Sequence, residues 1–140
     1  MKYKIIEKAT EMFLKLGFKS VTMDDIANEM CISKKTIYKY FENKEILISE
    51  GTKAVHEKIH DTINTIVSKN FNAIHENFEI RKMFREMFNS FDNSPVYQLK
   101  KHYPEIHNEF ICREVDECNA VFRQNIAKGI KEGLYRENID

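Results

Sequence analysis

Apolar residues recur every three or four positions along the chain, and clean alternating runs of apolar and polar residues are absent. This period is typical of amphipathic α-helices, in which one stripe of side chains faces a core. Only four glycines and two prolines interrupt the 140 residues. One of them, Gly51, lies inside a helical pattern, at a cost of about 1 kcal/mol against alanine. The pattern therefore predicts an all-α protein.

Turn and cap residues divide this pattern into seven predicted helices. Gly17 ends the first, because a glycine past the last turn can adopt a left-handed cap. Thr22 is the expected N-cap of the second, with Asp25 in the place of the capping-box glutamate. Ser33 and Asn43 are expected to cap the next two helices. The predicted helices cover about residues 2–16, 23–30, 33–41, 44–68, 73–91, 95–102 and 104–132.

Composition narrows the class of protein. Hydrophobic residues make up 42% and charged residues 31% of the chain, which is typical of a soluble globular protein. No apolar run reaches the roughly 20 residues of a membrane span, and the charged N-terminus is unlike a signal peptide. We therefore expect a cytoplasmic protein. Its cysteines, Cys31, Cys112 and Cys118, are odd in number and not clustered, which predicts reduced thiols with packing roles.

The segment from Ser33 to Phe41 carries the strongest functional pattern. It reads Ser-Lys-Lys-Thr-Ile-Tyr-Lys-Tyr-Phe and contains three lysines, two tyrosines and no acid, although the formal net charge of the chain is zero. A short amphipathic helix, Met23–Met30, precedes it across a tight turn. Two short helices of this kind are typical of proteins that enter a DNA major groove. The alternative is a solvated lysine face with tyrosines that only pack.

The segment from Ala9 to Leu47 resembles the DNA-binding domain of TetR-type transcriptional regulators. The order and spacing of the family pattern are kept by Ala9, Phe13, Gly17, Phe18, Thr22, Asp25, Ile26, Ala27, Ile32, Ser33, Thr36, Ile37, Tyr38, Tyr40, Phe41, Lys44, Glu45 and Leu47. The later chain resembles the family's ligand-binding domain over residues 93–95, 103–105 and 129–136. This resemblance implies a three-helix helix-turn-helix domain over residues 1–46. A long fourth helix would join it to a ligand-binding and dimerisation domain over residues 47–140.

The resemblance also implies roles for single residues. Thr22, Tyr38 and Lys44 match phosphate-contacting positions, which set register and affinity but do not read sequence. Lys34, Lys35, Thr36, Lys39 and Tyr40 match groove-facing positions, and Ser33 completes the expected DNA-binding set.

Two positions depart from the family pattern. Cys31 stands in the inter-helix turn, where the family often has glycine, and a left-handed backbone would strain cysteine. We therefore expect Cys31 in an ordinary backbone conformation. Lys35 stands where the family often has a small residue, and its added charge is expected to alter the preferred DNA sequence.

The fifth to seventh predicted helices are rich in phenylalanine, tyrosine and methionine. In the family that the chain resembles, such helices and the fourth enclose an effector cavity. A ligand that moves the fourth helix changes the distance between the two DNA-binding domains of a dimer. Such a ligand must bind two conformations of the protein with different affinities. The alternative is an aromatic stripe that is plain core. The candidate cavity residues are Ile59, Ile63, Phe84, Met87, Phe88, Tyr97, Tyr103, Phe110 and Phe122.

The resemblance implies a homodimeric repressor that leaves a palindromic operator when a small molecule binds, without catalysis or cofactor. A non-catalytic protein that sequesters a partner is the second hypothesis. A metal-dependent hydrolase is the third. His56 and His60 have the spacing of a metal pair, but no further ligand completes the set and no catalytic motif is present. We therefore expect no metal site.

The family usually continues with two more helices, which form a dimeric four-helix bundle, whereas this sequence ends at Asp140. We expect either a truncated chain or a dimer that uses other surfaces. In the absence of those helices, Phe110, Val121 and Phe122 would expose apolar surface.

Overall fold

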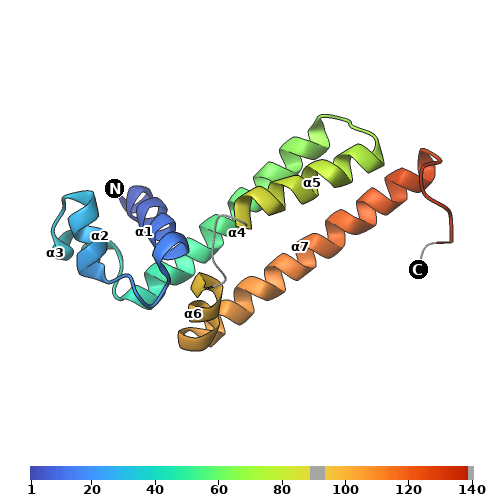
Figure 1. The fold of residues 1–140 in the computed structure, drawn as a ribbon. Helices are drawn as coiled ribbons and strands as arrows, with labels where there is room; N and C mark the ends of the chain where they lie inside the picture. The colour runs from blue at the N-terminus through green and yellow to red at the C-terminus, as the bar shows by residue number, and fades with distance from the viewer. Residues whose placement is uncertain (89–93, 139–140) are drawn as a thin grey trace. The chain divides into compact units, whose positions relative to one another are not determined.

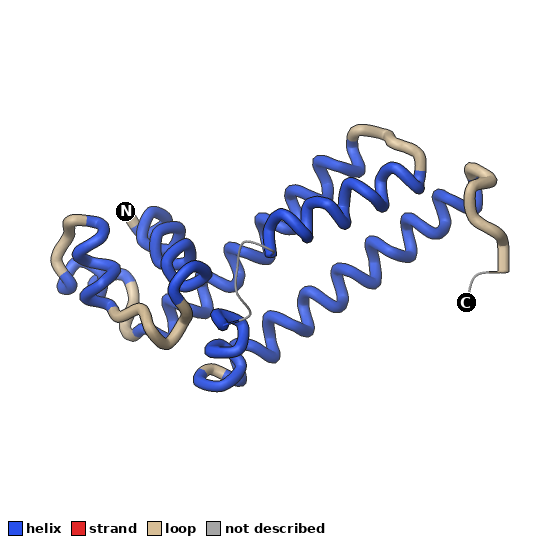
Figure 2. The backbone as a smooth tube through the Cα atoms, viewed as in Figure 1, coloured by secondary structure: helices blue, strands red, loops and turns tan. Residues whose placement is uncertain are grey.

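The structure, a computed structural model, describes residues 1–88 and 94–138, and every regular element in these ranges is a helix (Figures 1 and 2). The predicted all-α fold is therefore confirmed. The helices are α1 (Lys2–Leu16), α2 (Met23–Met30), α3 (Lys34–Tyr40), α4 (Lys44–Ser68), α5 (Ala73–Phe88), α6 (Ser94–His102) and α7 (Pro104–Lys131).

Most predicted helix ends agree with these bounds to within a residue. Helix α3 is shorter than predicted at both ends, because Ser33 and Phe41 are its extended caps. Helix α6 begins at Ser94, one residue before the predicted start, and α7 ends one residue early at Lys131. The predicted extension of α5 to residue 91 lies outside the described residues.

Two compact units make up the fold, and each is built from segments far apart in the sequence. Among the described residues, the first contains 1–57 and 94–111, and the second contains 58–88 and 112–138. Helices α4 and α7 therefore contribute residues to both units. The predicted functional boundary between residues 46 and 47 stays a prediction.

The first unit is built around an apolar core that holds the first three helices together. Phe13 of α1, Ile26 of α2 and Ile37 of α3 are fully buried in it. Burial of each such side chain contributes about 1.5–3 kcal/mol against leaving it in water. Helix α1 packs against α2 and α6, and α2 packs against α3. The core therefore fixes where the outer side of α3 points.

Helix α6 is joined to the connection between α1 and α2. The side-chain oxygen Oε1 of Gln98 accepts hydrogen bonds from the backbone N–H groups of Lys19, at 2.9 Å, and Ser20, at 3.3 Å. Leu99, the next residue, is buried in the core of the first unit. The sequence predicts this helix as part of the effector region, whereas the structure packs it against α1 and the connection between α1 and α2.

Gly17 ends α1 as predicted, but not with a left-handed helical cap. Its φ is 105° and its ψ is 145°, so the chain leaves the helix through a backbone conformation that side chains disfavour. A Cβ atom at Gly17 would also lie 2.3 Å from Oε1 of Gln98. The backbone conformation of the turn therefore favours glycine here, and a Cβ atom would in addition displace the Gln98 amide.

A buried polar network joins α5 to α7 in the second unit. The Asn125 amide nitrogen donates to the carbonyl of Ala73 at 3.0 Å and to the Glu76 carboxylate at 3.1 Å. The other Glu76 oxygen accepts from the Lys128 ammonium at 2.7 Å. Glu76 is 3% exposed, so this ion pair supplies the partner that a buried carboxylate needs. The start of α5 is thereby held against α7.

Candidate nucleic-acid interface

The cap at Thr22 fixes the start of α2. The backbone N–H of Asp25 donates to the Thr22 hydroxyl at 3.1 Å, and the Thr22 N–H donates to the Asp25 carboxylate at 2.9 Å. This second hydrogen bond is the largest cause of a lowered pKa at Asp25. The predicted capping box is therefore confirmed, and it keeps a negative charge at the positive end of the helix.

The turn between α2 and α3 is left-handed at Cys31, where φ is 55° and ψ is 40°. The expectation of an ordinary backbone at Cys31 was therefore wrong. The N–H of Ile32 donates to the carbonyl of Ala27 at 3.0 Å, and the Cys31 N–H donates to that of Asn28 at 3.2 Å. These are the two hydrogen bonds of a Schellman cap, which requires a left-handed residue at this position. The need to satisfy the last carbonyls of α2 outweighs the preference of the cysteine side chain.

Helix α3 is held by a cap at its start and by buried residues beneath it. The Thr36 N–H donates to the Ser33 hydroxyl at 3.1 Å. Ile37 and Phe41 lie one turn apart and are buried in the core of the first unit. Because a helix has 3.6 residues per turn, Tyr38 and Lys39 face away from that core.

The predicted DNA-binding residues of α3 form one accessible surface. An open depression on this surface is lined by Ser33, Lys35, Thr36, Tyr38 and Lys39. Tyr38 is 43% and Tyr40 39% exposed, so both rings can contact another molecule. We call this surface the α3 face, and it consists of Ser33, Lys34, Lys35, Thr36, Tyr38, Lys39 and Tyr40.

The lysines of the α3 face differ in their partners. The Lys34 ammonium lies 3.2 Å from the Asp24 carboxylate of α2, in an exposed pair of the kind usually worth less than about 1 kcal/mol. Neither Lys35 nor Lys39 has a carboxylate within ion-pair distance among residues 1–88 and 94–138. These two ammonium groups remain available for an anion such as a DNA phosphate.

The two predicted phosphate contacts outside α3 lie in different environments. Thr22 is exposed, and its hydroxyl can still donate a proton while it accepts from Asp25. The Lys44 ammonium donates to the carbonyl of Lys19 at 3.4 Å and lies 5.8 Å from the centre of the Phe13 ring. Burial is the main cause of the lowered pKa of Lys44. The Lys44 ammonium is therefore partly occupied by contacts within the first unit, whereas the Thr22 hydroxyl can still donate.

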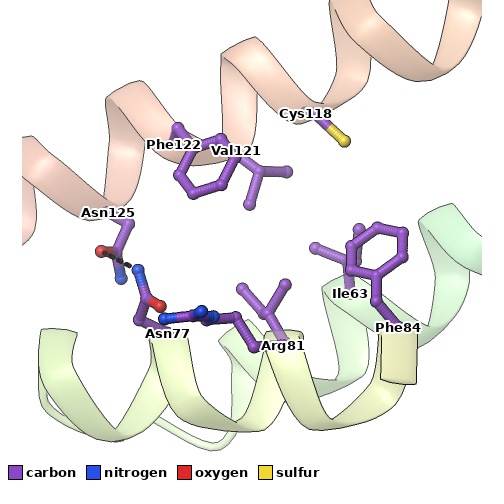
Figure 3. A pocket seen from close by; sticks show the side chains of 9 residues that line it. Ile63, Asn77, Arg81, Phe84, Cys118, Val121, Phe122 and Asn125 are labelled. Atoms are coloured by element: carbon purple, nitrogen blue, oxygen red, sulfur yellow. Dashed lines mark hydrogen bonds between the residues drawn. The ribbon is translucent and has the colours of Figure 1, made fainter. Parts of the chain in front are cut away.

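The second unit contains a cavity between α4, α5 and α7 (Figure 3). Three of the predicted effector residues line it, namely Ile63, Phe84 and Phe122. Ile59 and Met87 belong to the same unit but are not lining residues, and the side chain of Phe88 lies outside the description. Tyr97, Tyr103 and Phe110 belong to the first unit. The structure therefore does not bring the whole predicted set together, and a ligand role for these residues stays a prediction.

Sequence reasoning missed six residues of this cavity because it selected mainly large apolar side chains. The missed residues are Asn77, Ile80, Arg81, Cys118, Val121 and Asn125. A signal for them exists in the spacing, because residues 77, 80, 81 and 84 share one face of α5. Residues 118, 121, 122 and 125 repeat the same spacing on α7. Selection of every residue on these two helix faces identifies more of the cavity than selection of large apolar side chains.

The histidine pair of α4 has no metal-like surroundings in the described ranges. His60 contacts the Glu117 carboxylate, with 2.5 Å between Nδ1 and Oε1. No group of three histidine, cysteine, aspartate or glutamate side chains in these ranges is arranged to hold a metal ion. Among the described helices, none is long and apolar enough to cross a membrane.

Comparisons with known proteins agree with this arrangement. Residues 5–50 match the bacterial regulatory proteins of the tetR family. The chain is 28% identical over 133 residues to IcaR of Staphylococcus aureus (strain Newman), the negative transcriptional regulator of the biofilm operon icaADBC. That similarity covers 91% of this chain and 68% of IcaR. The HTH-type transcriptional regulator YhgD of Bacillus subtilis (strain 168) is 46% identical over 46 residues, which are 33% of this chain and 24% of YhgD.

The fold agrees as well. A transcriptional regulator from Cytophaga hutchinsonii superposes with a TM-score of 0.78 at 23% identity, over 97% of this chain and 70% of that one. The family match thus falls on the helices that present the α3 face, and the similarity of fold extends over nearly the whole chain. The predicted resemblance of the Ala9–Leu47 segment to TetR-type transcriptional regulators is therefore confirmed.

Proposed function

We propose that this protein is a TetR-type regulator, namely a homodimeric repressor that binds a palindromic operator and leaves it when a small molecule binds. Repression is supported by the similarity to IcaR, whose name describes a negative regulator. The observation that carries DNA binding is the α3 face, which presents two lysines without ion-pair partners in the described chain, beside two exposed tyrosines. The proposal gives the chain no catalytic role.

The small size of this face supports a dimer. One α3 face offers only a few side chains to DNA, and each phosphate or base contact contributes only modestly to affinity. Two copies related by a two-fold axis would present two such faces to two half-sites of a palindrome. The effector part of the proposal is supported by the cavity in the second unit, whose walls come from α4, α5 and α7.

The test measures DNA affinity after removal of two side chains from the α3 face. A duplex is selected from a random-sequence pool with the wild-type protein, and binding is then measured by fluorescence anisotropy at several salt concentrations. In Tyr38→Ala/Lys39→Ala we expect affinity to fall roughly 10- to 100-fold, on the order of 1–3 kcal/mol. The slope of log affinity against log salt should also become shallower by about one.

The matched control removes an exposed aromatic and an exposed lysine from another helix. Phe78 and Lys82 lie one turn apart on α5, and both side chains are more than half exposed. Phe78→Ala/Lys82→Ala should bind the duplex like wild type. Equal affinity in the two double variants would rule out the α3 face as the DNA contact, and binding without salt dependence would argue against phosphate contacts altogether.

A further inference from the structure

The cavity of the second unit is narrow and mostly apolar. Its volume is about 50 Å³, and its apolar walls are Ile63 of α4, Ile80 and Phe84 of α5, and Val121 and Phe122 of α7. One water needs about 10–15 Å³ on this measure, so only a few methylene-sized groups fit inside. Phe122 is 53% exposed, so a longer molecule could extend past it. The space therefore suits a slender apolar chain.

Polar side chains gather at one end of the cavity, where Asn77, Arg81 and Asn125 lie (Figure 3). Asn125 has no capacity left for a ligand. Its Nδ2 donates to the Ala73 carbonyl and the Glu76 carboxylate, and its Oδ1 accepts from the Tyr135 hydroxyl at 3.0 Å and from Asn77 at 3.5 Å. New hydrogen bonds at this end must therefore come from Asn77 and Arg81.

Arg81 is exposed and places a positive charge at this end of the cavity. Its side chain runs back along α5 toward Asn77, as expected for a long residue on a helix (Figure 3). In the described chain no carboxylate lies within ion-pair distance of its guanidinium. The nearby Glu76 is already paired with Lys128 at 2.7 Å. A guanidinium has five N–H donors and no acceptor, so the group that fits here is an acceptor, and best an anion.

We propose that this cavity binds a small apolar carboxylate, with its chain between Ile80, Phe84 and Val121 and its carboxylate on Arg81. The inference rests on the proposed function, because it names the chemical class of the effector. A planar carboxylate can accept two parallel hydrogen bonds from guanidinium, which a hydroxyl cannot. Octanoate is the probe, and 1-octanol is its neutral match with the same chain length.

Cys118 provides a direct readout of occupancy. It lines the cavity and is partly buried, and burial is the main cause of the raised pKa of its thiol. Cys112 is exposed on the same helix and does not line the cavity. Alkylation by N-ethylmaleimide is followed at each cysteine by mass spectrometry. Octanoate should slow alkylation of Cys118 several-fold and leave the rate at Cys112 unchanged.

Two arginine variants test the assignment of the carboxylate. Arg81→Gln should raise the octanoate concentration for half-protection by on the order of tenfold, the worth of a charge-assisted hydrogen bond. Arg85→Gln, one turn further along α5 and also exposed, should leave it unchanged. Protection by 1-octanol should be the same in all three proteins. No protection by octanoate, or equal protection in wild type and Arg81→Gln, would overturn the proposal.

Failure of this inference can be told apart from failure of the proposed function. Octanoate is added to the DNA titration at the concentration that protects Cys118, and the affinity for the selected duplex is expected to fall. DNA binding without any protection of Cys118 would reject the carboxylate and leave the repressor intact. Protection in a protein that binds no DNA would reject the repressor and leave the carboxylate site intact. Protection with unchanged DNA affinity would reject the effector role.

Discussion

At the scale of single residues, Cys31 adopts a left-handed backbone conformation although an L-residue prefers negative φ. The turn needs a residue with positive φ, and this conformation costs an L-residue roughly 1–2 kcal/mol. The Cys31 side chain is exposed, so no packing offsets that cost. Sequence reasoning recognised the conflict but assumed that the backbone would change. The structure keeps the backbone, because the Schellman hydrogen bonds of α2 depend on it.

We expect Cys31→Gly to raise the free energy of unfolding by about 0.5–1 kcal/mol. Glycine removes the left-handed cost, although part of this gain is offset by the greater freedom of glycine in the unfolded chain. Urea unfolding followed by circular dichroism measures the change. Cys31→Ala is the control, because it removes the thiol but keeps the Cβ atom, and it should be close to wild type. The explanation fails if glycine and alanine have the same effect.

At the scale of helices, the contact between α1 and α4 explains a glycine that sequence reasoning treated as a weak point. A Cβ atom at Gly51 would lie 2.6 Å from the Thr10 hydroxyl oxygen, which is too close for a real contact. The Thr10 hydroxyl is buried and has no hydrogen-bond partner. The absence of a side chain at Gly51 therefore allows the two helices to approach, at the cost of helix propensity.

The double variant Thr10→Ala/Gly51→Ala should separate the effect of helix propensity from the effect of the contact with Thr10. Gly51→Ala alone gains about 1 kcal/mol of helix propensity but loses 1–3 kcal/mol to overpacking, so we expect a net loss. Removal of the Thr10 side chain relieves the clash, so the double variant should be about as stable as wild type or better. Unfolding free energies of both single variants and the double variant give the coupling energy. Additive effects would show that the two residues do not meet.

At the scale of the whole molecule, the unit that carries the α3 face contains more than the first three helices. Leu99 and Gln98 of α6 belong to the first unit, so a segment from the later chain helps to hold the connection before α2. The cavity lies in the other unit, and α4 and α7 contribute residues to both. In the proposed function, these two continuous helices are the elements that couple the cavity to the α3 face.

If two copies bind one operator, the spacing of its half-sites must match the distance between the two α3 faces. Insertion of five base pairs between the half-sites of the selected duplex rotates them by about half a turn of DNA. We expect affinity to fall at least tenfold, because only one head can then contact its half-site. Anisotropy titration measures the affinity, and sedimentation of the complex counts the bound copies. Equal affinity for a duplex with a single half-site would contradict a dimer.

The sequence by itself determined the helices, most of their ends and the composition of the α3 face. These features depend on residues a few positions apart, such as the Thr22–Asp25 capping box and the buried Ile37–Phe41 pair beneath α3. Local hydrogen bonds and helical period can be read from neighbouring residues without knowledge of the rest of the fold.

Only the tertiary structure decided where α6 packs and which residues surround the cavity. Gln98 meets Lys19 across 79 residues of sequence, and Asn125 meets Ala73 across 52. No local pattern specifies such partners, because they are selected by packing of whole helices against one another. Cys31 has a different, local reason, because the cap hydrogen bonds of α2 outweighed the preference of one side chain.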